Sequence, residues 1–539
     1  MGYRIQLGSN AVPHCLHRIS LWSNVKNAGC SISVQRCPVM WNSTVTVQTV
    51  IIIMTLAKQV IGGASVITLA GVGARALSFV TIPILTPLLG PEPYGVAALA
   101  GTLVSLSSIL ALLGIDMAYA RFFLQEDMTY RLSVERFCWR FSVVGSIGYA
   151  VLVGGGWYWF GHRWLPSDHQ TIAVYSLAAV ILSVAVAMAT TRIRLAGNYG
   201  KLALALTISA FVSVLISIGT AIYWRPDIRA LFLGVLGASF TTLVLLGIPN
   251  RSVFLKRSGL PSGMKRAVIS LGLASSITAP MHWLISSTDR WFLAEYSNTT
   301  VIGIYSMASN VALLGLLLNS SLTLTWFPEA SRLYGRHTSS ALVPLGRLWE
   351  RLVIGLAVVW VAISAAGGDV LRLLAAPGFH QGTKYIPWLA GGVFFYGLAG
   401  LANTTFFLEG KMRYVAYYWL AGGALSLCIN LLLVPRLGAY GAAIAQCVSY
   451  GFIAVGILLA SRKILPLPID WLRLAVGLLS ALIAGLVMSF GWLENPLLSL
   501  LGKFPVGILI STLLLFVIAP DWFGYAFHKV RQATIPRKT

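Results

Sequence analysis

The sequence predicts an all-α polytopic membrane protein with about fourteen transmembrane helices, arranged as two pseudo-symmetric six-helix lobes and two further C-terminal helices. Three observations lead to this prediction. Of the 539 residues, 57% are hydrophobic and only 10% are charged, whereas soluble domains carry about 25% charged residues. Apolar runs of about 20 residues recur along the chain. Two short fragments also repeat at nearly the same spacing.

Each apolar run is long enough to cross the hydrocarbon core of a membrane as a helix. The runs cover roughly residues 58–87, 93–118, 141–160, 171–195, 202–224, 230–249, 268–293, 300–327, 345–366, 384–409, 413–434, 438–461, 470–491 and 504–520. The predicted lobes are residues 54–250 and 268–463, joined by a basic linker at 251–267. The last two helices lie within 464–525, and a basic tail follows at 526–539.

Residues 1–53 differ from the rest of the chain. They contain no long apolar core and no small-residue cleavage pattern, so we do not expect a secretory signal peptide here. At Met54 the sequence changes to "MTLAKQVIGGASVITLAGVGARALSF", which is typical of the start of a membrane protein. We interpret Met54 as the initiator. A basic arm that lies on anionic lipid is the alternative for residues 1–53.

The distribution of positive charge predicts the topology. The chain has 39 Lys and Arg against 16 Asp and Glu, and a net charge of +23. Most of the basic residues lie in short clusters between apolar runs, and these clusters fall in alternate loops. Cytoplasmic loops show this pattern, whereas a nucleic-acid-binding protein presents a continuous basic face. We therefore expect both termini to lie in the cytoplasm, and we expect no nucleic-acid partner.

An internal repeat underlies the two predicted lobes. "YGVAALAGTLVSL" resembles "IGIYSMASNVALL" when Gly95 is set on Gly303, an offset of 208 residues. "RLAGNYGK" resembles "FLEGKMRY" when Gly197 is set on Gly410, an offset of 213. Because each unit has an even number of spans, both units face the same way. A binding site is then expected between the lobes, near the middle of the membrane.

Two arginines lie outside the loop clusters, Arg75 in the first run and Arg290 near the end of the seventh. A charge at the centre of a membrane helix costs about 2.5–3.5 kcal/mol, so such a residue usually faces protein or water. On a helix, Asp289 lies on the face next to that of Arg290, together with His282. One interpretation is an anion-binding arginine beside a titrating Asp289/His282 pair. The other is an Arg290–Asp289 clasp at the outer interface.

Several further charges lie at the inner ends of apolar runs. Each is interpreted as an interface charge or as part of a gate whose salt bridges break on opening. They are Asp116, Arg121, Glu329, Arg332 and Glu409. Two polar residues inside runs, Asn430 and Gln446, are predicted to hold helices together.

The sequence lacks the motifs of soluble catalysis. It contains no H-E-x-x-H, nucleotide-binding loop or G-x-S-x-G, and its six cysteines form no C-x-x-C pair. We therefore expect no catalytic residue, no metal and no cofactor. A membrane-embedded glycan polymerase or ligase would need a large outer loop with polar catalytic residues, and all the predicted outer loops are short.

Three stretches carry a resemblance to a known family. "LLGPEPYGVAALAGTLVSLSSILALLGIDMAYARFF", "SSTDRWFLAEYSNTTVIGIYSMASN" and "INLLLVPRLGAYGAAIAQCVSY" resemble bacterial polysaccharide-biosynthesis flippases. These belong to the superfamily that includes multidrug and toxin extrusion (MATE) antiporters and the lipid II flippase. The resemblance runs from about Met54 to Asp470. It implies a MATE-like fold with two lobes around a central cavity, alternating access, and a location in the bacterial inner membrane.

The resemblance also implies a substrate. Members carry an oligosaccharide on polyprenyl pyrophosphate between membrane leaflets, for surface polysaccharides such as O-antigen or exopolysaccharide. They often have cationic cavity residues on the first helix of each lobe, which here correspond to Arg75 and Arg290. Asp289 would then limit the positive charge of the cavity or titrate to drive release.

Two other functions remain open. A cation-coupled multidrug exporter of the same fold would prefer an acidic cavity. A scaffold role among other glycan-assembly proteins is compatible with flipping.

Overall fold

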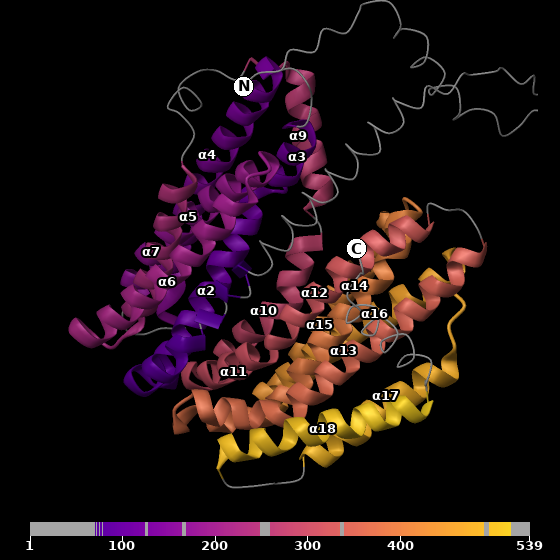
Figure 1. Cartoon of the computed structure of the whole chain (residues 1–539). Helices are drawn as coiled ribbons and strands as arrows, with labels where there is room; N and C mark the ends of the chain where they lie inside the picture. Colours follow the sequence, from indigo (N-terminus) through magenta and orange to yellow (C-terminus); the bar gives the residue numbers. More distant parts are fainter. Residues whose placement is uncertain are drawn as a thin grey trace, which may run out of the picture. The chain divides into compact units, whose positions relative to one another are not determined.

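The apolar runs form helices, because in hydrocarbon a helix satisfies its own backbone hydrogen bonds. The computed structural model describes residues 70–71, 73–74, 76–77, 79–123, 128–163, 169–247, 259–276, 278–334, 339–489 and 495–518. These residues form helices and no strand (Figure 1). Residues 1–53 and Arg75, for which the sequence made predictions, lie outside the described residues.

The helices follow the predicted order. In the first half they are Phe79–Leu89, α2 (Pro91–Leu112), α3 (Ile115–Phe123), α4 (Met128–Phe160), η2 (Gly161–Arg163), α5 (His169–Leu195), α6 (Tyr199–Tyr223) and α7 (Ile228–Leu246). In the second half they are α9 (Ser262–Ser275), α10 (Thr278–Tyr296), α11 (Thr299–Ala312), α12 (Leu314–Tyr334), α13 (Ser339–Leu374), η3 (Pro377–Tyr385), α14 (Ile386–Leu408), α15 (Met412–Leu437) and α16 (Ala439–Ile464). Two more follow, α17 (Trp471–Ser489) and α18 (Pro496–Ile518).

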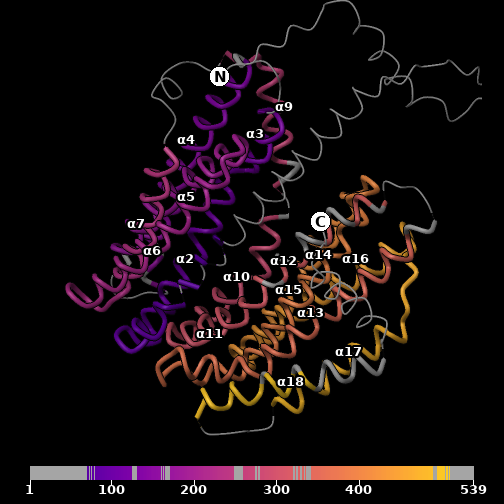
Figure 2. The backbone as a smooth tube through the Cα atoms, in the orientation of Figure 1, coloured from indigo at the N-terminus to yellow at the C-terminus, as the bar shows by residue number. Residues whose placement is uncertain are grey.

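Eleven spans within the described residues are long and apolar enough to cross a membrane. The prediction of an all-α, multi-pass membrane protein is confirmed, and the number fourteen stays a prediction. The helices of each half pack mainly on one another, and α17 and α18 pack on α13. Figure 2 traces α2–α7 in indigo to magenta, followed by α13–α16 in orange and α17–α18 in yellow.

Two predicted spans are broken helices. Residues 93–118 form α2 and α3, which are separated by Leu113 and Gly114 with φ of 45° and 67°. Residues 268–293 form parts of α9 and α10, which are separated near Ser276. The second break has a consequence for the fold, because α9 packs on α3 of the first half, while α10 packs mainly on α15 of the second half and also contacts α16 and α2.

The glycines matched in the sequence repeat occupy similar places in the structure. Gly197, between α5 and α6, and Gly410, between α14 and α15, have positive φ of 72° and 65°. The amide after each glycine donates to the carbonyl five residues back, at 3.2 Å for Asn198 and 2.8 Å for Lys411. Both turns are therefore the same helix-ending motif, in which glycine tolerates the left-handed conformation. The other matched glycines, Gly95 and Gly303, meet where α2 packs on α11.

Candidate functional site

A polar cavity of about 610 Å³ lies between helices of the two halves. Its walls come from the helix Phe79–Leu89, α2, α6 and α7 on one side and from α10, α11, α12, α14 and α16 on the other. Most of the polar residues that line it are hydroxyl or amide side chains. The polar lining residues are Thr81, Tyr94, Thr102, Ser105, Ser213, Ser217, His282, Ser286, Ser287, Arg290, Ser306, Ser309, Asn310, Tyr396, Gln446 and Tyr450. No aspartate or glutamate is among the described residues that line this cavity.

Helix α10 supplies the cationic part of the lining. His282, Ser286 and Arg290 are spaced by four residues, so they follow one another along a single helix face. All three line the cavity. Asp289 lies on the next face, where it is 1% exposed and does not line the cavity. Arg290 therefore faces the cavity, whereas the neighbouring Asp289 is buried among other helices.

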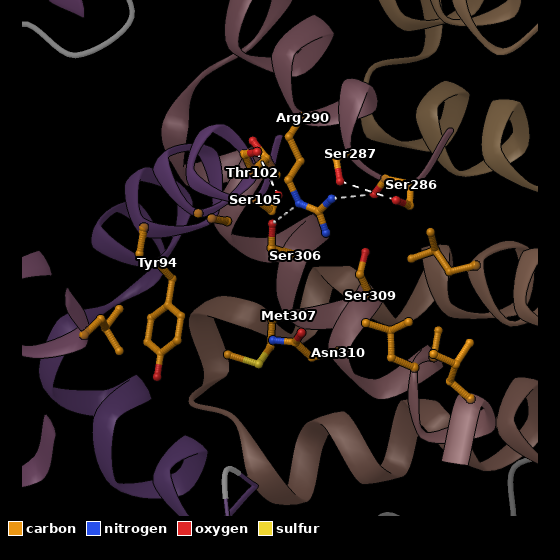
Figure 3. A pocket seen from close by; sticks show the side chains of 18 of the residues that line it. Tyr94, Thr102, Ser105, Ser286, Ser287, Arg290, Ser306, Met307, Ser309 and Asn310 are labelled. Atoms are coloured by element: carbon orange, nitrogen blue, oxygen red, sulfur yellow. Dashed lines mark hydrogen bonds between the residues drawn. The ribbon is translucent and has the colours of Figure 1, made fainter. Parts of the chain in front are cut away.

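Three polar contacts hold the Arg290 guanidinium, and Figure 3 shows the two to Ser306 and Ser286. Nε donates to Ser306 Oγ at 3.1 Å, and Nη1 donates to the carbonyl of Ser286 at 2.9 Å. Nη1 also lies 3.5 Å from Asp289 Oδ1. Among the described residues, none accepts a hydrogen bond from Nη2. Since a guanidinium has five donor hydrogens and three of them point to these acceptors, the two hydrogens of Nη2 remain available to a ligand in the cavity.

Asp289 is held from two sides. One carboxylate oxygen, Oδ2, accepts a hydrogen bond from the Tyr305 hydroxyl of α11. The other, Oδ1, accepts from the Arg290 backbone amide at 2.8 Å. Tyr305 is itself buried, and its hydroxyl lies 3.4 Å from Gln446 Oε1 of α16. These bonds hold the buried carboxylate in place next to the Arg290 guanidinium. A titrating role for Asp289 stays a prediction.

His282 has partners of its own, separate from those of Asp289. Its Nδ1 lies 2.9 Å from the Tyr450 hydroxyl, and its ring centroid lies 5.0 Å from that of Tyr396. Asp289 and His282, which were predicted to act as a pair, therefore have different hydrogen-bond partners. His282 shares the cavity with Arg290 instead.

The predicted gate residues whose side chains the structure describes do not line the cavity. Asp116 and Arg121 are both in α3, where five residues of helix place side chains about 140° apart. Arg332 is in the last turn of α12. Glu329 belongs to the same helix, but its side chain lies outside the described part of the chain. A gating role for these residues stays a prediction.

Glu409 links two helices of the second half. Its Oε1 accepts a hydrogen bond from the Tyr334 hydroxyl at 2.5 Å, and its Oε2 lies 3.8 Å from Lys411 Nζ. The bond to the Glu409 carboxylate raises the pKa of Tyr334 above the ordinary value. Because Tyr334 ends α12 and Glu409 ends α14, this contact does not join the two halves of the chain.

Sequence reasoning missed several residues of the cavity. Gln446 was interpreted as a helix–helix contact; its Oε1 does lie 3.4 Å from the Tyr305 hydroxyl of α11, and the residue lines the cavity as well. Asn430 donates from Nδ2 to the carbonyl of Ser426 at 2.8 Å within its own helix, α15, so its predicted role as a contact between helices stays a prediction. Ser306 and Tyr396 gave no signal, because single polar or aromatic residues are common in apolar runs. In the part of the chain that the structure describes, no group of His, Cys, Asp or Glu is arranged to hold a metal ion.

Solved structures with a similar fold are membrane transporters. The lipid II flippase MurJ in an inward closed conformation matches with a TM-score of 0.69 and 12% identity, over 85% of this chain and 99% of that one. An inward-facing MATE-family multidrug resistance transporter matches with a TM-score of 0.50 and 14% identity, over 75% and 94%. A Vibrio cholerae MATE transporter, VcmN, also matches with a TM-score of 0.50 and 14% identity, over 76% and 97%.

No curated protein matches the chain by sequence. The model of one protein family does match, and its description is "Polysaccharide biosynthesis protein". The match covers residues 60–334, just over half of the chain, and includes the helices from α2 to α12. These helices supply lining residues of the cavity from both halves of the chain. The chain is therefore a multi-pass membrane protein that belongs to the polysaccharide biosynthesis protein family.

Proposed function

We propose that the protein is a flippase that moves an oligosaccharide linked to polyprenyl pyrophosphate from the cytoplasmic to the periplasmic leaflet of the bacterial inner membrane. The observation that carries this proposal is that Nη2 of Arg290 has no partner among the described residues and lies in a cavity lined by many hydroxyl groups. Guanidinium N–H groups form strong, charge-assisted hydrogen bonds with phosphate oxygens, and Nη2 offers two of them. The serine, threonine and asparagine side chains around it offer donors and acceptors for sugar hydroxyls.

The physical task explains why such a cavity is needed. A sugar–pyrophosphate head is anionic and strongly hydrated, so the hydrocarbon core of the membrane excludes it. Fixed donors in the cavity replace the lost water. No covalent bond has to change, and the protein has to bind the head group from either side and cross between two states.

An apolar groove is consistent with a lipid-linked substrate. A second cavity, of about 910 Å³, lies among α13, α14, α16 and α17, and its lining is largely apolar. Trp360, Trp388 and Phe394 are among its aromatic residues. Such a surface accommodates hydrocarbon, so a polyprenyl chain would remain in an apolar environment while its head group occupies the polar cavity.

The contacts at one end of the polar cavity suggest which state the structure represents. Near the start of α2, the Thr86 hydroxyl accepts a hydrogen bond from the Ala376 amide at 3.1 Å. Tyr94 packs edge-to-face on Phe379 of η3, with ring centroids 5.5 Å apart. With cytoplasmic termini, this end would face the periplasm. We therefore interpret the described state as closed toward the periplasm.

A cation-coupled drug exporter is less well supported. It would use carboxylates to bind cationic drugs, and the described residues that line the cavity include none. Asp289 is buried and already bonded to Tyr305 and Arg290.

Complementation tests the proposal. In cells that lack the native gene, Arg290→Gln should reduce surface polysaccharide strongly at unchanged protein abundance. Losing a charge-assisted contact costs about 1.5–3 kcal/mol, or roughly ten- to a hundredfold in affinity. Arg436→Gln serves as the matched control, because Arg436 is exposed at the end of α15 and does not line the cavity.

Two outcomes would contradict the proposal. One is normal export with Arg290→Gln at equal abundance. The other is low abundance with Arg290→Gln that is restored by adding Asp289→Asn, because that result would make the pair a structural clasp alone.

A further inference from the structure

Four rings from four helices of the second half form one cluster beside the cavity. They are His282 of α10, Tyr396 of α14, Trp419 of α15 and Tyr450 of α16. The His282 centroid lies 5.0 Å from Tyr396, 5.9 Å from Trp419 and 6.0 Å from Tyr450. Tyr396 lies 5.7 Å from Tyr450, so the four rings contact one another in one aromatic cluster, called here the ring wall.

Three members of the ring wall face the cavity and the fourth supports them. His282, Tyr396 and Tyr450 line the cavity, whereas Trp419 is 7% exposed and packs behind His282. The bond between Tyr450 and His282 Nδ1 fixes the orientation of the imidazole. A wall with every ring held by two or more others is rigid, which reduces the entropy lost when a ligand binds.

The ring wall also carries polar atoms without protein partners. Within the described residues, the Tyr396 hydroxyl and His282 Nε2 form no hydrogen bond. If these side chains only packed the helices together, aliphatic residues or phenylalanine would be sufficient at the same positions. Polar atoms at the edge of aromatic faces instead suit a ligand with an apolar face and a polar rim.

The position of the ring wall relative to Arg290 limits what that ligand is. His282 and Arg290 are eight residues apart on α10, which corresponds to about 12 Å along the helix. Ser286 lies between them on the same face and lines the cavity. A pyrophosphate bound at Arg290 would therefore place the group attached to it near the ring wall.

We propose that the ring wall is the binding site for the sugar next to the pyrophosphate, a pyranose whose C–H face stacks on Tyr396 while its hydroxyls bond to Tyr396, His282 and Ser286. This rests on the proposed function, because it names a second part of the same cavity. Arg290 then selects a pyrophosphate, and the ring wall distinguishes a sugar-bearing lipid from the bare polyprenyl pyrophosphate. Discrimination by one stacked ring is roughly two- to tenfold.

Affinities for two probes test this assignment. The probes are undecaprenyl pyrophosphate and undecaprenyl pyrophosphate linked to N-acetylglucosamine, bound to the full chain in lipid nanodiscs and measured by native mass spectrometry. The wild type should bind the sugar-linked probe more tightly. Tyr396→Leu should abolish this preference, and Tyr396→Phe should retain most of it because the ring remains. Arg290→Gln should weaken the binding of both probes.

The control is Tyr417→Leu on α15, which removes a tyrosine that is 64% exposed and does not line the cavity. It should leave the preference unchanged. Three results would overturn the assignment: equal binding of both probes by the wild type, equal weakening of both probes by Tyr396→Leu, or loss of the preference with Tyr417→Leu. Binding of neither probe by the wild type would instead overturn the proposed function on which it rests.

Discussion

Gly95 of α2 and Gly303 of α11 approach each other so closely that neither position has room for a side chain. A Cβ on Gly95 would overlap the carbonyl oxygen of Thr299 and lie 2.9 Å from the Gly303 amide nitrogen. A Cβ on Gly303 would overlap the carbonyl oxygen of Pro91 and lie 3.0 Å from the Gly95 amide nitrogen. Each contact is the counterpart of the other at an offset of 208 residues, so the two halves meet here about a local two-fold axis.

This contact predicts the effect of adding a methyl group. Gly95→Ala or Gly303→Ala should push α2 and α11 apart, since the overlapping atoms are backbone and cannot rotate away. Because Ser306 lies one turn along α11 and lines the cavity, the cavity should become more accessible from that end. Labelling of an Asn310→Cys variant by a membrane-impermeant thiol reagent, added from the periplasmic side, should increase several-fold.

Gly219→Ala is the matched control for this experiment, because a Cβ at that helical glycine would have no atom within 4 Å. Labelling should stay at the level of the parent chain. Equal labelling with Gly95→Ala and Gly219→Ala would show that the α2–α11 contact does not close the cavity.

The bonds around Asp289 predict an energetic coupling with Tyr305. Asp289→Asn and Tyr305→Phe each remove part of the same buried network, so their effects should not add. Leaving one buried polar group without its partner costs about 1–3 kcal/mol. Thermal unfolding in detergent should give a double variant that is less destabilised than the sum of the single variants. Additive shifts in Tm would mean that the two residues act independently.

A buried ion pair predicts how α18 is held to α13. Lys503 Nζ lies 2.7 Å from Asp369 Oδ2, and the Ser499 hydroxyl donates to the same oxygen at 3.0 Å. Removing one partner of a buried pair is strongly destabilising, by about 3–5 kcal/mol, whereas replacing both by apolar residues is often tolerated. Lys503→Met should therefore lower Tm markedly.

Adding Asp369→Leu to Lys503→Met should recover much of that loss, because no buried charge is then left alone. A double variant as unstable as Lys503→Met would contradict this account of the contact between α13 and α18. Lys411→Met is the control, because its pair with Glu409 is longer, at 3.8 Å, and more exposed.

Topology offers a test that does not depend on the substrate. Reporter fusions after Arg140, Arg266 and Arg413 should report the cytoplasm, because the basic clusters lie at these positions. Fusions near Asp168 and Gly378 should report the periplasm. A periplasmic signal after Arg266 would invalidate the division into two six-helix lobes, and it would reverse the assignment of the closed end.

Much of the fold could be predicted because it depends on patterns within the sequence. The lengths of the apolar runs predicted the helices. Gly197 and Gly410, which the sequence repeat matches to each other, both have positive φ in the structure. The breaks in two helices were missed, because Gly114 looks like any other glycine in an apolar run. Whether such a residue bends a helix depends on its packing, here of α3 and α9 on each other.

From the sequence, the site could be predicted only at positions where a charged residue lies inside an apolar run. Arg290 stood out because few charges lie inside apolar runs. Its partners Tyr305 and Ser306, and the ring wall residue Tyr396, come from other helices, and their sequence context is that of ordinary membrane helices. Their roles follow from distances that the sequence does not contain.

The central claim is that Arg290 binds the pyrophosphate of a lipid-linked oligosaccharide while it crosses the membrane. The most direct measurement is the rate at which lipid-linked oligosaccharide, extracted from the same cells, moves between the leaflets of proteoliposomes. The wild type should move it faster than protein-free vesicles. Arg290→Gln should be at least about tenfold slower, and Arg290→Lys should lie between, because an ammonium keeps the charge but loses the planar fork. A wild-type rate with Arg290→Gln, or no transfer above protein-free vesicles by the wild type, would contradict the account.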